Sequence, residues 1–117
     1  MIKTFKDIKV WEKAHRLTLE IYKITVKFPT EEKFCLVNQI RRAIISVSSN
    51  IVEGFKRKSL KDRLHFYNMA DSSLEEVKYQ LMLAFDLKYI TQEEYQKALD
   101  SAEEISKMLN SWIKSQK

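Results

Sequence analysis

Apolar residues recur at alternating spacings of three and four along almost the whole chain, which is the pattern of helices with one buried face. Four such stripes follow one another, and a seam of this kind is typical of helices that pack side by side. The stripes predict these core positions: Val10, Ala14, Leu17, Ile21, Ile24 and Phe28; Val37, Ile40, Ile44, Val47 and Ile51; Tyr67, Ala70, Leu74, Val77, Leu81 and Ala84; Tyr95, Ala98, Ala102, Ile105, Leu109 and Trp112.

Polar residues around the first two stripes predict where those helices begin and end. Asp7 is expected to cap a first helix that runs to Phe28, where Pro29 stops it. Thr30 is expected to cap a second helix that ends near Gly54. Because Gly54 is the only glycine of the chain, we interpret it as a helix C-cap in the left-handed conformation.

Two further caps predict the remaining helices. Ser59 is expected to begin a third helix that fades near residues 88–89, and Thr91 with Glu94 forms a capping box at the start of a fourth. The connections are short, so successive helices should pack antiparallel. The sequence therefore predicts an all-α, antiparallel up-and-down four-helix bundle that forms a single domain over residues 1–117.

The first helix carries a second apolar face, which a bundle helix does not need for its own core. Two interpretations are open: a surface for self-association, which we favour, or wide burial within the monomer. Trp and Tyr are residue types that often anchor interfaces. The residues predicted for an oligomer interface are Ile8, Trp11, His15, Leu19, Tyr22 and Val26, with Ile45 and Val52 of the second helix.

The net charge of +5 over 117 residues is distributed unevenly. Residues 1–70 hold 15 lysines and arginines against 7 acidic residues, and residues 71–117 hold 6 against 9. This asymmetry permits an anionic partner, head-to-tail association of copies, or solubility alone. The sequence has no apolar run long enough for a membrane span. The single cysteine, Cys35, is expected in a buried or half-buried packing role and fits a cytoplasmic protein.

A group of basic residues is the best candidate for a functional surface. Several of its members follow Gly54 directly, in the predicted connection between the second and third helices. Basic residues gathered at one end can neutralise phosphates of a nucleic acid, whereas the alternative is a solvated loop. The predicted nucleic-acid-binding residues are Arg41, Arg42, Lys56, Arg57, Lys58, Lys61 and Arg63.

Two histidines have the acid-x-x-His spacing of carboxylate-bridged metal sites, since Glu12 precedes His15 and Asp62 precedes His65. Both pairs point away from the predicted core stripes, so we expect no metal site. No phosphate-cradling glycine loop and no nucleophile with an activating base can be identified. We therefore expect a protein that is not an enzyme and that needs no cofactor.

Asn50 and Glu53 place polar groups near the end of the second helix. We favour a structural contact, in which Glu53 fixes a subunit interface or receives Arg41 or Arg42 of a neighbour. The alternative is a solvated glutamate beside a helix cap.

Several segments together resemble the family of four-helix-bundle, 23S rRNA intervening-sequence proteins. The segments are residues 5–11 (Phe-Lys-Asp-Ile-Lys-Val-Trp), 28–34 (Phe-Pro-Thr-Glu-Glu-Lys-Phe), 39–43 (Gln-Ile-Arg-Arg-Ala), 49–54 (Ser-Asn-Ile-Val-Glu-Gly) and 70–75 (Ala-Asp-Ser-Ser-Leu-Glu). Arg41 and Arg42 match the arginines of one motif, and Asn50, Glu53 and Gly54 match the other. Cys35 stands where a glycine is common, which should leave the second helix more continuous at its start.

The resemblance implies function as well as fold. The family is similar to the accessory protein of diversity-generating retroelements, a pentameric barrel that binds nucleic acid and the reverse transcriptase. It therefore implies a homopentamer, a ring with a basic surface toward RNA or DNA, and it does not imply catalysis. Our leading hypothesis is a non-enzymatic ring that binds structured RNA or DNA with low sequence specificity. The alternative is a scaffold that docks a protein partner without touching nucleic acid.

Overall fold

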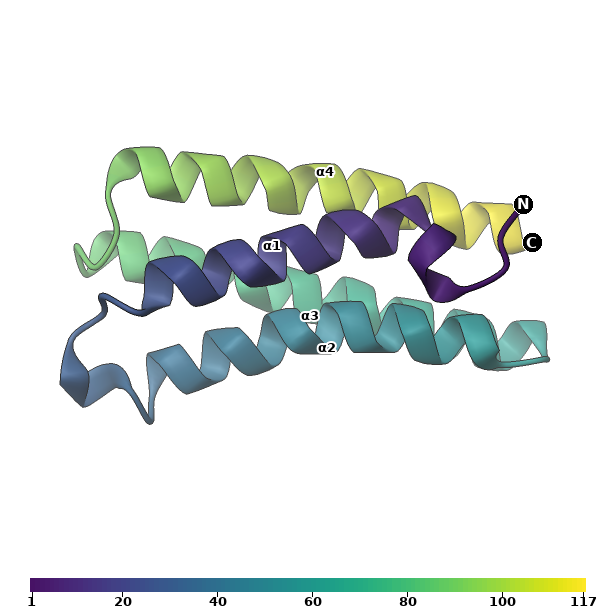
Figure 1. Ribbon diagram of the computed structural model, residues 1–117, viewed down its shortest axis with the longest axis horizontal. Coiled ribbons are helices and arrows are strands. Elements are labelled where there is room, and N and C mark those ends of the chain that lie inside the picture. Colours follow the sequence, from purple (N-terminus) through teal and green to yellow (C-terminus); the bar gives the residue numbers. More distant parts are fainter.

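Four long helices make up the protein in the computed structural model, which describes residues 1–117 (Figure 1). The elements in chain order are η1 (Phe5–Asp7), α1 (Lys9–Thr25), η2 (Thr30–Glu32), α2 (Leu36–Lys56), α3 (Leu60–Asp86) and α4 (Gln92–Gln116), where η marks a 3₁₀-helix. The predicted all-α class with four helices is confirmed, and the body measures 43 × 25 × 20 Å. No helix combines the length and apolar character that a membrane span requires.

The two ends of the bundle hold different parts of the chain. Both termini and the α2–α3 connection lie at one end, and the α1–α2 and α3–α4 connections lie at the other (Figure 1). At the second end, Tyr89 donates a hydrogen bond from its hydroxyl to Oε2 of Glu32 (2.7 Å). This hydrogen bond with Glu32 raises the pKa of Tyr89 above its usual range.

The predicted stripes form the core. Every residue of the first three stripes is buried, and in the fourth only Tyr95 and Trp112 are half-buried. The helical period alone therefore identified the buried side of each helix. Outside the predicted stripes, the core also includes Ile8, Leu36, Ala43 and Ile90.

The start of the chain differs from the prediction that Asp7 caps the first helix. Thr4 instead caps η1, and Asp7 closes this capping box by accepting backbone N–H groups of Lys3 (2.9 Å) and Thr4 (3.0 Å). These two hydrogen bonds hold the pKa of Asp7 below its usual range. Helix α1 begins only at Lys9, after Ile8 leaves the 3₁₀-turn in an extended conformation.

The second helix also begins later than predicted, because Thr30 starts the short helix η2 and α2 starts at Leu36. Glu32 supplies the acceptor at this break, since its Oε1 receives the backbone N–H of Leu36 (3.3 Å). Cys35 lies at the N-cap of α2 and is exposed, so the prediction of a buried packing role and of a more continuous helix was wrong.

Gly54 is not a helix C-cap. It lies inside α2, which continues to Lys56, and no glycine of the chain has a positive φ. A β-carbon at residue 54 would lie 2.5 Å from Cε1 of Tyr67, so the glycine is required by close packing between α2 and α3. A glycine permits the close approach of another helix as well as a left-handed turn, and Gly54 is used for the close approach.

The left-handed residue that closes a helix is Lys88, with φ 65°. The N–H of Lys88 donates to the carbonyl of Phe85, and the N–H of Tyr89 donates to the carbonyl of Ala84, both at 2.9 Å. These two bonds form a Schellman motif at the end of α3. A lysine therefore occupies the position that the sequence pattern assigns to glycine.

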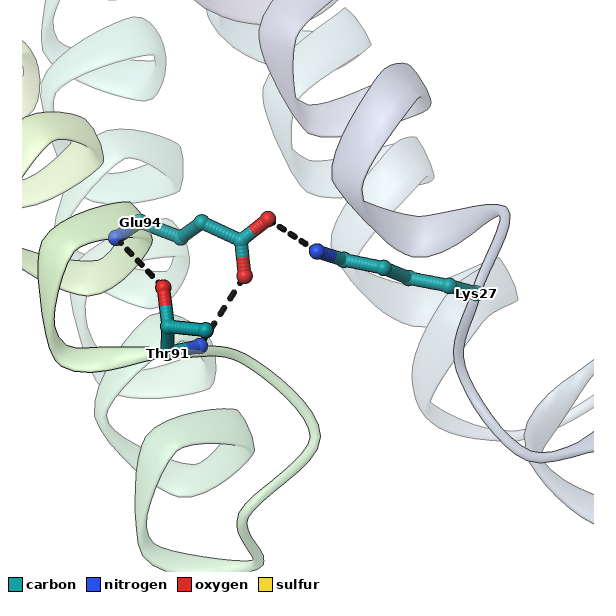
Figure 2. Close-up of polar contacts among 3 residues, drawn as sticks. All are labelled: Lys27, Thr91 and Glu94. Carbon is teal, nitrogen blue, oxygen red and sulfur yellow. Dashed lines mark hydrogen bonds and ion pairs between the residues drawn. The ribbon is translucent and has the colours of Figure 1, made fainter.

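The capping box of the fourth helix is confirmed (Figure 2). Glu94 donates its N–H to Oγ1 of Thr91 (3.1 Å), and Oε1 of Glu94 accepts the N–H of Thr91 (2.9 Å). The same carboxylate pairs with Lys27, which follows α1. The contacts with Lys27 and with the Thr91 backbone hold the pKa of Glu94 below its usual range. One side chain thus joins the end of α1 to the start of α4.

Candidate nucleic-acid interface

The α2–α3 connection presents the predicted basic residues in a compact turn. Lys56 ends α2, Ser59 caps α3, and Oγ of Ser59 accepts the N–H of Asp62 (3.1 Å). Because the two helices are joined by only Arg57 to Ser59, the side chains on both sides of the turn emerge from the same end of the bundle.

Three lysines of this turn are free to meet a ligand. Lys56, Lys58 and Lys61 are exposed, and none of them lies within ion-pair distance of a carboxylate. Three unpaired ammonium groups on so short a segment create a local positive potential, which the carboxylates of Glu53 and Asp62 offset only in part.

The two arginines of the turn are held by the protomer. Arg57 pairs with Glu53 (Nη2 to Oε2, 3.3 Å), and its guanidinium carbon lies 4.5 Å from the centre of the Phe66 ring. Arg63 donates from Nη1 to the carbonyl of Lys58 (2.7 Å), which closes the turn. Arg57 is therefore oriented by its neighbours, and Arg63 stabilises the connection itself.

Arg41 and Arg42 lie elsewhere. Both belong to the first turns of α2, and Arg42 precedes Lys56 by fourteen residues of one helix, about 21 Å at the rise of an α-helix. The predicted nucleic-acid-binding residues therefore form two separate groups, with Arg41 and Arg42 toward the start of α2 and the other five around the α2–α3 connection.

Arg41 supports the fold. Its guanidinium carbon lies 4.3 Å from the centre of the Tyr22 ring, while its Nε donates to Oγ1 of Thr25 (2.9 Å) and its Nη2 to the carbonyl of Tyr22 (3.2 Å). Arg41 is half-buried, so this side chain of α2 binds the last turn of α1 through one carbonyl and one hydroxyl. Arg42 is exposed.

The predicted motif residues Asn50 and Glu53 make contacts within the protomer. Nδ2 of Asn50 donates to the carbonyl of Ser46 (2.8 Å) and to its Oγ (3.0 Å), and Oγ of Ser46 lies 2.8 Å from Oγ of Ser73 on α3. Asn50 thus belongs to a polar contact between α2 and α3. Within the protomer Glu53 pairs with Arg57, which directly follows α2; the predicted contact with Arg41 or Arg42 of a neighbouring subunit stays a prediction.

The two terminal segments add positive charge to this end, and their lysines are not among the predicted binding residues. Residues 1–9, 53–63 and 107–117 together hold eleven lysines and arginines and only three acidic residues, while the rest of the chain holds ten against thirteen. We name this surface the basic end. A shared cavity of Ile2, Lys9, Met108 and Ser115 shows that the first and last segments lie side by side there. The predicted up-and-down topology already indicated this, because such a topology brings both termini to the end that holds the connection between the second and third helices.

The second apolar face of α1 is exposed over only part of its length. Leu19 is 58% exposed, Tyr22 37% and Val26 76%, and Ile45 of α2 is 41% exposed. Ile8, predicted for the interface, is instead buried at 1%, because η1 folds the chain back so that residue 8 enters the core. The exposed face thus begins at the middle of α1.

Trp11, His15 and Val52 complete the set predicted for an interface. Trp11 is half-buried, with its ring 4.8 Å from that of Phe5 and stacked on that of His15 at 5.1 Å. His15 is exposed and Val52 is half-buried. Phe34, which the prediction did not include, is 82% exposed beside Tyr22 and Ile45.

The acid-x-x-His pairs do not assemble a metal site, since no group of three histidine, cysteine or carboxylate side chains converges anywhere in the structure. Glu12 pairs with Arg16 (2.7 Å), and the backbone N–H of Asp62 donates to the capping hydroxyl of Ser59. His65 is exposed beside Phe66.

Taken together, the fold and this end define a class of small helical-bundle protein with strongly polarised charge. The family model described as 23S rRNA-intervening sequence protein matches residues 6–111, so the chain belongs to that family. No curated protein matches the chain. Among solved structures, it is similar to a protein of unknown function from the S23 ribosomal protein family of Bacteroides thetaiotaomicron, with a TM-score of 0.85 and 32% identity over 93% of this chain and 98% of that one.

Proposed function

We propose that this chain is a cytoplasmic, non-catalytic protein whose antiparallel four-helix protomers form a ring and bind structured RNA or DNA through the basic end. The observation that carries the proposal is the set of unpaired lysines, Lys56, Lys58 and Lys61, on a surface that holds eleven basic residues and only three acidic ones. Neutralising phosphates with such groups releases counterions, which drives binding of the nucleic-acid backbone.

The chemistry of the basic end favours backbone contacts over base recognition. Its free cationic groups are lysines, which act as point charges rather than as planar forks that match a base edge. Low sequence specificity follows, because phosphate contacts position a protein and carry no direct sequence information. The family name, which refers to 23S rRNA, favours RNA as the first ligand to test.

Self-association would strengthen this binding. One protomer offers few phosphate contacts, and copies that present their basic ends together would add theirs. The exposed apolar side chains of Leu19, Tyr22, Val26 and Ile45 support such an assembly, because recurring apolar residues on one face mark interaction surfaces. A pentamer is the number that the family resemblance implies.

The test compares two variants with the same change in charge. Lys56, Lys58 and Lys61 are all replaced by glutamine in one variant; Lys23, Lys88 and Lys97, which are exposed and unpaired away from the basic end, are replaced in the control. Affinity for a fluorescent double-stranded RNA hairpin is measured by anisotropy between about 50 and 200 mM salt.

We expect the basic-end variant to bind weakly, with a slope of log K against log salt that is shallower by about two to three. The control should retain most of the wild-type affinity and slope. Equal losses in both variants would mean that only total charge matters. Absence of salt-dependent binding in the wild type would favour the alternative, a scaffold that docks a protein partner. An oligomer of unchanged mass in all three proteins would show that assembly does not depend on these lysines.

A further inference from the structure

A groove beside the C-terminal half of α1 combines apolar and cationic side chains. It is lined by the rings of Tyr22 and Phe34 and the side chain of Ile45, and by Lys33, Arg41 and Arg42. No carboxylate lines it, and neither Lys33 nor Arg42 has an acidic partner in the protomer. We call it the α1–α2 groove. Its natural occupant is an apolar surface that carries negative charge.

The same molecule carries a surface of that chemistry on the outer side of α3. Glu75, Tyr79, Met82 and Asp86 follow one another at spacings of four, three and four, so they share one face of the helix. We call this face the α3 stripe. Tyr79 is 56% exposed and Met82 is 43% exposed, and neither packs against the core. A carboxylate therefore flanks the apolar pair on each side.

The carboxylates of the α3 stripe are available to a partner. Asp86 is exposed and has no ion pair in the protomer. Glu75 pairs with Lys78 at 3.0 Å, yet its side chain remains 69% exposed. Opposite charges around matched apolar centres are the arrangement that fixes register between two surfaces.

The groove and the stripe also lie at the same level along the bundle. The Tyr89–Glu32 hydrogen bond and the Lys27–Glu94 pair bring the α1–α2 and α3–α4 connections together at one end. Met82 lies four residues before the end of α3 and Arg42 six residues after the start of α2, about 6 and 9 Å from that end. Two copies that stand side by side in the same direction can therefore bring the two surfaces into contact.

We infer that copies of this chain associate side by side through two different surfaces, with the α3 stripe of one copy seated in the α1–α2 groove of the next. This inference rests on the self-association in the proposed function and adds the second surface, since the predicted interface residues include Tyr22 and Ile45 of the groove and none of the α3 stripe. A heterologous contact of this kind generates a ring when its rotation closes. Copies related by an axis along the helices would then present all their basic ends on one rim.

Two variants test the pairing. Phe34→Asp with Ile45→Asp blocks the groove, and Tyr79→Lys with Met82→Lys blocks the stripe; all four residues are exposed, so the protomer should fold. Met69→Lys is the matched control, because Met69 is also 43% exposed on α3 and lies off the stripe. Mass is measured by light scattering after size-exclusion chromatography, and folding by circular dichroism.

We expect each blocked variant to be a folded monomer and the Met69→Lys protein to keep the wild-type mass. An equimolar mixture of the two blocked variants should form a two-copy complex, since one partner retains the groove and the other retains the stripe. A stripe variant with wild-type mass, or blocked monomers that do not combine, would overturn the pairing while leaving RNA binding by the basic end intact. A wild-type monomer would overturn the self-association as well.

Discussion

The ring of Tyr67 lies directly against the backbone of Gly54, where an added β-carbon would be 2.5 Å from Cε1 and 2.8 Å from Cδ1. Tyr67 is fully buried, and its ring meets that of Trp112 edge-on at 6.1 Å. The Tyr67 side chain thus packs α2, α3 and α4 together beneath the basic end. The close approach of α2 and α3 there depends on the absence of a side chain at residue 54.

Gly54→Ala should destabilise the protein, although alanine is the better helix former by about 1 kcal/mol. Overpacking against a buried ring costs about 1–3 kcal/mol, so after the gain in helix propensity we expect a net loss of up to about 2 kcal/mol in the free energy of unfolding, measured by chemical denaturation. Ser49→Ala, at an exposed position of α2, is the control and should not destabilise. A smaller loss for Gly54→Ala in a Tyr67→Leu background would assign the effect to the ring; a gain in stability would contradict the packing argument.

Tyr67→Phe should stabilise the protein, because the Tyr67 hydroxyl is buried without a hydrogen-bond partner. The same burial raises the pKa of Tyr67. Removing an unsatisfied buried group recovers part of its desolvation cost, about 1 kcal/mol. Thermal and chemical unfolding of the two proteins measure the difference. A loss of more than about 1 kcal/mol would show that the hydroxyl has a partner, for which the indole N–H of Trp112, also buried and unpaired, is the candidate.

The sequence predicted the core well because a helical stripe depends only on the order of residues along one helix. The role of Gly54 depends on Tyr67, which lies on another helix, so local cap chemistry suggested the wrong explanation. The contacts of Arg41 could not be predicted for a related reason, because they involve Tyr22 and Thr25 on another helix. The lysines near both termini were not included in the predicted set, because they become neighbours of the α2–α3 connection only in the folded bundle.

Lys88→Gly should stabilise the protein, because Lys88 holds φ 65° at the end of α3. A left-handed conformation costs a residue with a β-carbon about 1–2 kcal/mol, and glycine adopts it without that strain. After allowing for the greater freedom of glycine in the unfolded chain, we expect a gain of about 1 kcal/mol. Lys88→Ala removes the same charge but keeps the β-carbon, and an equal gain in that variant would rule out backbone conformation as the cause.

Glu94→Gln should reduce stability at neutral pH and have little effect in acid. The pKa of Glu94 in the folded protein is held below its ordinary value near 4.5 by Lys27 and the Thr91 backbone. The stabilisation from the carboxylate is therefore present above that ordinary value and is lost as the pH falls through the folded pKa. Because Lys27 is half exposed, we expect less than about 1 kcal/mol. Urea unfolding at several pH values measures it, with Glu93→Gln as the control; a difference that persists in strong acid would contradict the assignment.

Arg41→Gln should destabilise the protein and Arg42→Gln should not. The guanidinium of Arg41 donates to both Thr25 and the carbonyl of Tyr22 while it lies over the Tyr22 ring, whereas Arg42 is exposed. Losing these contacts from a half-buried position should lower the free energy of unfolding by about 1–2 kcal/mol. Arg41→Lys should recover little, since a lysine lacks the planar group that stacks and donates in two directions. Urea unfolding of the three variants at one protein concentration measures these effects, and equal stabilities for Arg41→Gln and Arg42→Gln would return Arg41 to the set of residues free to bind a ligand.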